Sequence, residues 1–266
     1  MSFNIILAGS RGKMGSEAVK MINKEPTFSL VACIDHKNGP STTQEVQELA
    51  GKALPVYTDA GRCFQEVEAD IFIDLTNPEA GYINTKSALT HGLRSVVGTS
   101  GFSNEEINEL SNIAVEKATG CIIAPNFALG AVLMMQFSKM AAKYFPDVEI
   151  IEKHHDQKLD APSGTAKKTV ELIQETRKQK QQGHPDEVET VAGARGANMD
   201  GIPVHSMRLP GMVAHQEVIF GSKSQLLTIK HDSFHRESFM DGLKLAMNQV
   251  GQIEGLVYGL EHVMDV

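Results

Sequence analysis

The chain has few cysteines and no long apolar run, and both absences limit what it can be. Its three cysteines, Cys33, Cys63 and Cys121, are widely spaced and form no CxxC pair, which argues against a zinc site or a redox dithiol. No apolar stretch is as long as a membrane span, and the run at residues 1–8 is too short for a signal peptide. We expect a soluble, cytosolic protein without a membrane partner, in which Cys33 and Cys121 are small buried side chains.

Positive charge is also scarce, because 25 lysines and arginines stand against 33 aspartates and glutamates. The net charge of -8 argues against a nucleic-acid partner, since phosphate binding depends on clustered lysine and arginine. Neither HExxH nor HxH occurs among the ten histidines, so a metal-dependent hydrolase is disfavoured and we expect no metal. With 266 residues, the chain can form one large or two modest domains without disulfides.

What the chain does contain is a dense group of polar residues at 153–165, with the sequence KHHDQKLDAPSGT. The run VEIIE at 148–152 predicts a strand before this group, and residues 166–175 predict a helix with one apolar face after it. Two adjacent imidazoles and Lys158 lie just ahead of that helix. Such a segment can bind a small anion and supply protons to it.

The start of the predicted helix is itself suited to an anion. Pro162 disfavours helix before it, so Ser163 is the expected N-cap. The backbone N–H groups of Gly164 and Thr165 then point outward with the positive end of the helix dipole. A carboxylate or a phosphate binds favourably at such a position.

The N-terminal region has the order of a dinucleotide-binding unit. An apolar strand at residues 3–8 is followed by the loop GSRGKMG at 9–15, a helix that ends before Pro26, a second strand at 28–34, and then Asp35. Strand, glycine loop, helix, strand and acid is the βαβ order that binds NAD or NADP, although GxxGxxG differs in spacing from GxGxxG.

The residues of the loop at 9–15 have distinct expected roles. We expect Gly9 to make the tight turn, Gly12 to let a pyrophosphate approach the backbone, and Gly15 to permit close helix packing. Arg11 and Lys13 either add positive charge at the phosphates or are solvated loop residues.

Asp35 is placed to accept hydrogen bonds from an adenosine ribose, which favours NADH. His36 and Lys37 could lie beside a 2'-phosphate, so NADPH stays open.

Further strands at 71–75, 95–97 and 121–124 alternate with helices at 79–90 and 104–117, the latter with a capping box made by Ser103 and Glu106. This alternation predicts an α/β fold with a doubly wound parallel sheet.

The pattern changes after residue 127. A helix at 129–144 is followed by the strand and helix described above, and then by a polar stretch at 174–189 that we interpret as solvated. Short alternating runs at 202–209, 216–220 and 226–231 predict strands that look antiparallel, with a hairpin turn at 221–224. These features predict a smaller α+β domain with a mixed or antiparallel sheet, followed by a helix at 239–250.

Several of these segments together resemble the dihydrodipicolinate reductases, also called 4-hydroxy-tetrahydrodipicolinate reductases. The pattern HHxxKxDAPSGTA of that family is matched at every fixed position by residues 154–166. The glycine loop at 9–15, Gly98-Thr99 and residues 124–127 extend the resemblance over most of the chain. Ser100 stands where the family often has threonine, and it keeps a hydroxyl.

The resemblance implies a Rossmann-type domain at 1–126 plus 235–266, and a substrate-binding and oligomerisation domain at 127–234. It implies reduction of a cyclic imine dicarboxylate with NADH or NADPH in the diaminopimelate route to lysine. It further implies a homotetramer assembled through sheets of the second domain, with strands at 216–231 as the edge. Hinges are expected near Asn126 and His235, and the helix at 239–250 is expected to return to the first domain.

The resemblance also assigns roles to residues. His154 and Lys158 become proton donors, and a substrate carboxylate is held by His155, Ser163, Gly164 and Thr165. The expected cofactor contacts are Gly9, Ser10, Arg11, Gly12, Lys13, Met14, Asp35, His36, Lys37, Gly98, Thr99, Ser100, Ala124, Pro125, Asn126 and Phe127.

Other interpretations stay open. A histidine in a strand is often structural, Asp160 is expected to fix a turn through hydrogen bonds to the backbone, and Lys153 is expected to be solvated. Arg195 and Arg208 either contact a second carboxylate or form structural salt bridges. The whole chain could be a non-catalytic nucleotide sensor, or a related dehydrogenase that acts on another amino-acid precursor.

Overall fold

The computed structural model describes residues 2–37, 40–178 and 180–264, and the chain forms two compact units. The first contains Met1–Phe127 and Phe239–Asp265, and the second contains Ala128–Ser238. The expected boundaries were 126/127 and 234/235. The helix at 239–250, observed as α8 (Met240–Gln249), belongs to the first unit.

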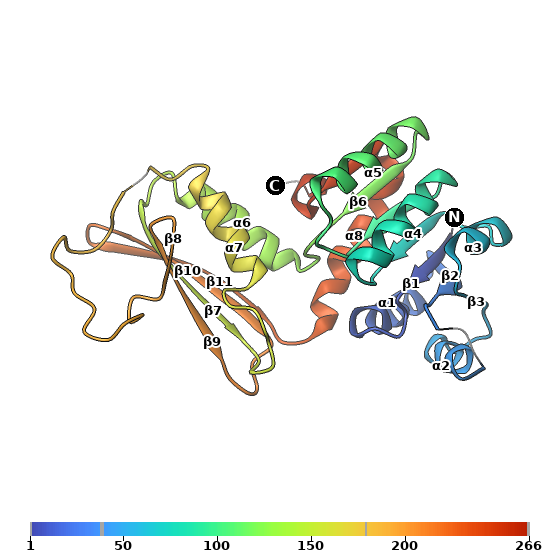
Figure 1. The fold of residues 1–266 in the computed structure, drawn as a ribbon, viewed down its shortest axis with the longest axis horizontal. Helices are drawn as coiled ribbons and strands as arrows, with labels where there is room; N and C mark the ends of the chain where they lie inside the picture. Colours follow the sequence, from blue (N-terminus) through green and yellow to red (C-terminus); the bar gives the residue numbers. More distant parts are fainter. Residues whose placement is uncertain (1, 38–39, 179, 265–266) are drawn as a thin grey trace. The chain divides into compact units, whose positions relative to one another are not determined.

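The first unit is built on a seven-stranded sheet in the order β12-β6-β5-β4-β1-β2-β3 (Figure 1). Every paired strand in it is parallel, and the chain winds outward from β1 in both directions, as a doubly wound sheet does. The predicted α/β fold is confirmed. The strands are β1 (Phe3–Ala8), β2 (Phe28–Ile34), β3 (Val56–Tyr57), β4 (Ile71–Asp74), β5 (Arg94–Val97), β6 (Gly120–Ile123) and β12 (Gly255–Tyr258).

Two layers of helices belong to this sheet. Helices α3, α4 and α5 pack in sequence in one layer, while α2, α1 and α8 pack in the other. The central strand β1 is covered on both sides, so that Ile5, Ile6 and Leu7 are all fully buried. The helices are α1 (Lys13–Lys24), α2 (Pro40–Ala50), α3 (Ala60–Glu66), α4 (Pro78–Thr90), α5 (Asn104–Glu116) and α8, with 3-10 turns at Arg236–Phe239, Val250–Gln252 and Leu260–Val263.

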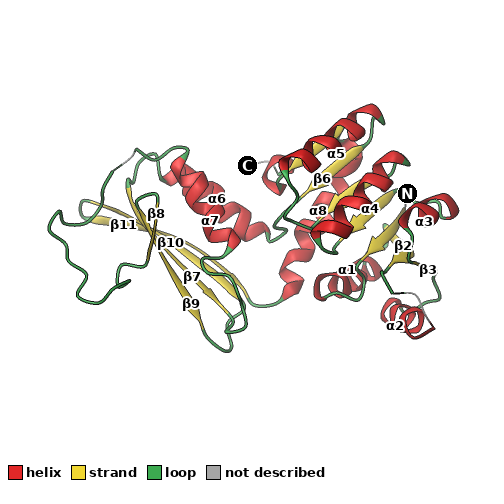
Figure 2. Cartoon of the chain, viewed as in Figure 1, coloured by secondary structure: helices red, strands yellow, loops and turns green. Residues whose placement is uncertain are grey.

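The second unit is a five-stranded sheet in the order β11-β10-β7-β9-β8, with two helices packed against each other (Figure 2). Its strands are β7 (Asp147–His154), β8 (Ala197–Met199), β9 (Ile202–Arg208), β10 (Ala214–Ser222) and β11 (Gln225–Ser233). Its helices are α6 (Leu129–Ala141) and α7 (Gly164–Gln174). The hairpin turn predicted at 221–224 is confirmed, because Ser222 pairs with Gln225 across β10 and β11.

The sheet is mixed, because β7 pairs in parallel with β9 and the other pairs are antiparallel. The predicted mixed or antiparallel sheet is confirmed: the strands after residue 190 pair antiparallel with one another, β8 with β9 and β10 with β11, while β9 pairs in parallel with the earlier strand β7. The physical reason is the helix between them: α7 and the long segment after it bring the chain back to the same end of the sheet, as in a βαβ crossover.

Four elements of the first unit lie outside the sequence prediction. Strand β3 has two residues and β12 has four, too few for a periodic signal. Helix α3 is seven residues long, and α2, with the sequence PSTTQEVQELA, is mostly polar. Tertiary packing, more than local periodicity, holds such short or polar segments in place.

The close packing expected at Gly15 is confirmed and can be tested. A Cβ added at Gly15 would lie 2.0 Å from the carbonyl oxygen of Gly9, so the loop or the helix would have to move. We expect Gly15→Ala to lower the free energy of unfolding by about 1–3 kcal/mol, as overpacking does.

Urea unfolding followed by circular dichroism measures this loss. Gly251→Ala is the matched control, since its Cβ would meet only the Arg94 side chain at 3.8 Å. Equal stabilities of the two variants would contradict the packing role of Gly15.

Candidate active site

The glycine loop forms an open helix start at the carboxyl end of β1. Gly9 has φ +83°, a conformation that glycine adopts without strain, and the Gly12 N–H donates to the Gly9 carbonyl at 2.9 Å. Helix α1 begins with no side-chain cap from Gly12, whereas Ser103 caps α5 through the predicted capping box. The first amides of α1 therefore lack a side-chain acceptor, which fits the approach of a pyrophosphate.

Asp35, just after β2, is already bound by a guanidinium. Its Oδ2 accepts from Arg11 Nε at 2.8 Å, and its Oδ1 accepts from Arg11 NH2 at 2.9 Å and from the Lys37 N–H at 3.0 Å. Burial by itself would raise the pKa of Asp35, but the hydrogen bonds from Arg11 and from the Lys37 N–H, together with the positive charge of Arg11, lower that pKa. Arg11 also reaches Glu45, at 3.0 Å, so it is not a solvated loop residue.

The other residues predicted at this end of the cofactor site are more exposed. His36 has a side chain 79% exposed and lies 3.4 Å from Asp35 Oδ1, and Lys13 is exposed at the first turn of α1. Ser10, in contrast, is fully buried in the loop. Cys33 and Cys121 are free and buried, as expected, and Cys63 is free and buried as well; burial raises the pKa of the Cys33 thiol to about 12.

A buried carboxylate joins two loops at the carboxyl edge of the same sheet. Asp74, the last residue of β4, is 0% exposed, and its Oδ1 accepts from the hydroxyls of Thr76 at 2.7 Å and Thr99 at 2.6 Å. Its Oδ2 accepts from Asn84 at 3.1 Å, and the Thr76 N–H donates to Oδ1. Asp74 thus fixes Thr99, a predicted cofactor contact, to the loop after β4.

The remaining predicted cofactor residues follow β5 and β6. A Cβ at Gly98 would lie 2.7 Å from the Phe127 ring, which is buried, so Gly98 makes room for that ring. Ala124 is buried and its N–H donates to Val97, while Pro125 is exposed. Residues 98–100 and 124–127 therefore end neighbouring parallel strands at one edge, where open α/β sheets bind ligands.

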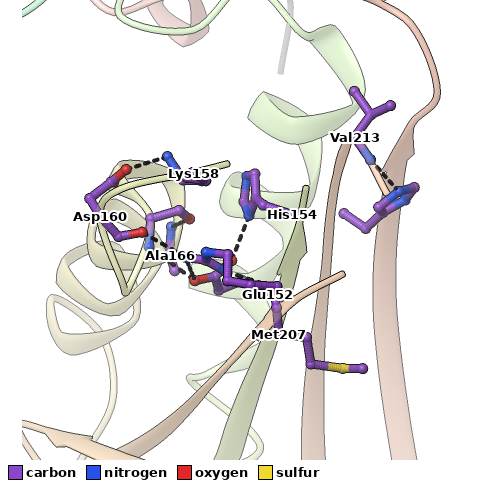
Figure 3. A network of polar contacts seen from close by, with 10 residues as sticks. Glu152, His154, Lys158, Asp160, Ala166, Met207 and Val213 are labelled. Carbon is purple, nitrogen blue, oxygen red and sulfur yellow. Dashed lines mark hydrogen bonds and ion pairs between the residues drawn. The ribbon is translucent and has the colours of Figure 1, made fainter. Parts of the chain in front are cut away.

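In the second unit, the polar segment is organised around Glu152 (Figure 3). Glu152 is 0% exposed, and its Oε2 accepts from His154 Nδ1 at 2.5 Å. Arg208 donates to both carboxylate oxygens, at 2.8 and 2.9 Å, and the Ser163 N–H donates to Oε1 at 3.2 Å. Burial by itself would raise the pKa of Glu152, but the hydrogen bonds from His154 and Arg208 lower it to about 2. The group is therefore a carboxylate at neutral pH.

Lys158 and Asp160 are connected to this group. Lys158 Nζ lies 2.6 Å from Asp160 Oδ1, and Arg208 donates to the Asp160 carbonyl at 2.7 Å (Figure 3). The side chain of Lys158 is 21% exposed. An unbroken series of contacts thus runs from His154 through Glu152 and Arg208 to the Lys158–Asp160 pair.

Helix α7 starts as the sequence predicts. Ser163 is its N-cap and accepts a hydrogen bond from the Ala166 N–H at 3.2 Å. The amides of Gly164 and Thr165 precede the capped one and have no acceptor within the helix. Nothing lies within 4 Å of a Cβ added at Gly164, so this helix start is open to a ligand.

Some expectations for this segment need correction. Lys153 is not solvated, because it forms an ion pair with Glu217 at 2.5 Å and its side chain is 21% exposed. His155 lies just after the end of β7, whereas His154 is the last residue of that strand. The Asp160 carboxylate binds the side chain of Lys158, whereas the sequence predicted only hydrogen bonds to the backbone.

Arg195 and Arg208 both form the structural salt bridges that the sequence left as one alternative. Arg195 pairs with Glu149 at 2.6 Å and with Glu187 at 2.8 Å, and Arg208 pairs with buried Glu152.

Comparison with known proteins finds one family that matches both parts of the chain. The models of the N-terminal and C-terminal parts of dihydrodipicolinate reductase match residues 3–127 and 130–264. The chain belongs to the dihydrodipicolinate reductase family. It is therefore a nicotinamide-dependent oxidoreductase, and the resemblance inferred from the motifs is confirmed.

Family members of high sequence identity cover the full length of the chain. The chain is 61% identical to the 4-hydroxy-tetrahydrodipicolinate reductase of Oceanobacillus iheyensis over 265 residues, covering 99% of this chain and 100% of that protein. It is 59% identical to the enzyme of that name from Geobacillus kaustophilus, with 100% of each covered. The structure of a dipicolinate-bound dihydrodipicolinate reductase from Paenisporosarcina sp. TG-14 is 47% identical, with a TM-score of 0.90 over 99% of this chain and 100% of that one.

Within the described ranges, no cluster of three or more His, Cys, Asp or Glu side chains could hold a metal ion. Across the same residues, no helix is long and apolar enough to cross a membrane.

The sequence analysis did not identify two buried acids, Asp74 in the first unit and Glu152 in the second. The predicted strand at 71–75 includes Leu75, so Asp74 was placed inside the strand. In the structure the strand ends at Asp74, which therefore lies at the edge of the sheet. Glu152 was included in the predicted strand at 148–152 without a role of its own. Its signal is its spacing: two residues before His154, it shares a face of β7 with that histidine.

The Asp74 contacts predict a measurable loss of stability. Asp74→Ala leaves the buried Thr99 hydroxyl and the Asn84 amide without their acceptor, so the free energy of unfolding should fall by about 3 kcal/mol. Asp70, at the other end of β4, accepts one hydrogen bond from the Asn4 N–H at 2.7 Å. Asp70→Ala is the control and should cost about 1 kcal/mol in urea unfolding. A smaller loss for Asp74→Ala than for Asp70→Ala would contradict the network.

Proposed function

We propose that this protein reduces 4-hydroxy-tetrahydrodipicolinate, or the dihydrodipicolinate derived from it, to tetrahydrodipicolinate with NADH or NADPH. The reaction belongs to the diaminopimelate route to lysine. The observation that carries the proposal is the network of the second unit: it joins an imidazole, an ammonium group and an open helix start. The dicarboxylate bound to the related Paenisporosarcina enzyme suits such a cationic site.

The two units divide the work in this proposal. Residues 1–126 and 235–266 bind the nicotinamide cofactor, and residues 127–234 bind the substrate. When bound, the cofactor supplies the hydride. The open start of α1 and the buried Gly9–Gly15 packing suit the pyrophosphate. Residues 98–100 and 124–127 lie at the carboxyl edge of the sheet, where the nicotinamide end would bind.

The side chains of the second unit hold the substrate and supply the proton. A carboxylate at the start of α7 accepts hydrogen bonds from the Gly164 and Thr165 amides, with Ser163 and His155 beside it. The reduced ring carries negative charge that must be protonated at carbon. His154 donates that proton, and Lys158 stabilises the developing charge and serves as a second donor.

Removing either donor should reduce turnover with little effect on cofactor binding. We expect His154→Ala and Lys158→Ala each to lower kcat by about 100-fold or more, the scale of lost general-acid catalysis. Lys168→Ala is the control, because Lys168 is an exposed lysine on α7 paired only with Glu171 among the contacts described. Steady-state kinetics with titration of NADH measures both effects.

Near-normal turnover in both donor variants would reject the assignment of His154 and Lys158.

Cofactor choice should depend on the Asp35–Arg11 pair. Asp35 can still offer a lone pair to a ribose hydroxyl, while Arg11, His36 and Lys37 offer positive charge to a 2'-phosphate, so we propose that both cofactors are used. Asp35→Ala removes the ribose acceptor and frees Arg11. The KM for NADH should therefore rise more than the KM for NADPH.

Steady-state kinetics with each cofactor tests this, and equal changes in the two KM values would count against the role of Asp35. Arg11→Met should have the opposite effect, because it removes the cation and leaves the carboxylate.

A single assay separates the activity from its alternatives. Substrate generated by the synthase that precedes this step is mixed with NADH or NADPH, and the loss of absorbance of the reduced cofactor is followed. A nucleotide sensor binds the cofactor without turnover. A dehydrogenase of another amino-acid precursor turns over only with a different substrate.

We further propose a cytosolic homotetramer assembled through the sheets of the second unit. Strand β11 lies at the edge of its sheet and exposes Leu226, 77% accessible. A sheet edge of this kind can pair with another copy.

A further inference from the structure

One buried charged group has no role in the mechanism proposed above. Glu152 lies two residues before His154 on β7, so both side chains leave the same face of the strand. The side chain of Glu152 is 0% exposed and that of His154 is 14% exposed. A buried carboxylate is unfavourable unless its oxygens are hydrogen-bonded, so its place in the strand requires a reason.

The contacts of Glu152 leave no room for a proton on it. Oε2 accepts from His154 Nδ1 and Arg208 Nη1, and Oε1 accepts from Arg208 Nη2 and the Ser163 N–H. An ionised carboxylate accepts about four hydrogen bonds, and these contacts use that capacity. The proton shared with His154 therefore resides on the imidazole nitrogen Nδ1.

This has a consequence for the imidazole. With Nδ1 bound to the carboxylate, neutral His154 has an unprotonated Nε2, and the protonated ring carries its second proton there. Only Nε2 can then give a proton to a substrate. A carboxylate behind a histidine fixes both its tautomer and its orientation, as acidic partners do for metal-bound and catalytic histidines.

We propose that Glu152 is a positioning residue of this enzyme, which holds His154 in the Nδ1–H tautomer and ties the imidazole to the anion-binding start of α7 through Ser163. Glu152 touches no reacting atom and acts through these two partners. Its catalytic consequence rests on the proposed function. The tautomer of His154 does not.

Arg208 makes this arrangement stable. Its guanidinium, from the neighbouring strand β9, balances the buried charge with two parallel hydrogen bonds and also binds the Asp160 carbonyl. The charged groups in this series of contacts are therefore Glu152, Arg208 and the Lys158–Asp160 pair. Arg208 thereby links the positioned imidazole to the loop that carries Lys158.

The first test uses the unmodified protein. Nitrogen-15-labelled histidine rings are observed by long-range nitrogen–proton correlation, and the His154 signals are identified by their loss in His154→Gln. At a pH where the ring is neutral, we expect the proton on Nδ1. A proton on Nε2 overturns the proposal, whether or not the protein reduces the proposed substrate.

The second test removes the charge with little change of shape. In Glu152→Gln, we expect kcat to fall by about 10–100-fold, the range for lost support of a histidine, while the KM for the cofactor stays within about two-fold. The pH dependence of kcat should also change, because the buried negative charge beside the ring has been removed. Unchanged kcat and an unchanged pH profile overturn the proposal.

Glu149→Gln is the matched control. Glu149 lies on the same strand and pairs with an arginine and a histidine, Arg195 at 2.6 Å and His205 at 2.8 Å. Among the described residues its hydrogen bonds go to Arg195 and His205 and not to His154, so its variant should lose an ion pair and keep its kcat and pH profile. An equal loss of kcat in both variants would assign the effect to general destabilisation and overturn the proposal. If Glu152→Gln does not fold, the tautomer measurement alone decides.

Discussion

The ion pair between Glu152 and Arg208 is the interaction on which the site of the second unit depends. A carboxylate removed from water is strongly unfavourable alone, and removing one partner of such a pair costs about 3–5 kcal/mol. Here the guanidinium and the carboxylate come from neighbouring parallel strands, where Glu152 pairs in register with Ser206 and His154 pairs with Arg208. A shift of one residue would turn Glu152 to the other face of the sheet. The register of β7 and β9 therefore decides whether Glu152 meets Arg208.

The two units use buried acids in a similar way but with different partners. Asp74 is held by hydroxyl and amide donors, and it connects the loops after β4 and β5. Glu152 is held by a guanidinium and an imidazole, and it connects a strand with the start of α7. In each unit, a buried acid fixes a segment of another element that could bind a ligand. In the first unit this segment is the loop that carries Thr99, and in the second it is the start of α7. Rigid support of this kind is what keeps binding groups in place before a ligand arrives.

Local features were predicted well because their causes are local. The tight turn at Gly9, the capping box of Ser103 and the N-cap at Ser163 depend on a few neighbouring residues, and all three are present. Buried parallel strands such as residues 28–34 have continuous apolar runs that cannot be confused with a loop. In contrast, Lys153 was expected to be solvated, because the strand that brings Glu217 beside it lies 64 positions away in the chain.

By itself, the amino-acid sequence determined the class of fold, the family and the segments that carry the chemistry, since the glycine loop and the 154–166 pattern are continuous in the chain. Only the tertiary structure decided which groups face each other. The Arg11–Asp35, Asp74–Thr99 and Glu152–Arg208 contacts join residues 24, 25 and 56 positions apart. The reason is physical: burial and strand register, which no short window of sequence contains, determine whether a charge is solvated, paired or used to orient another group.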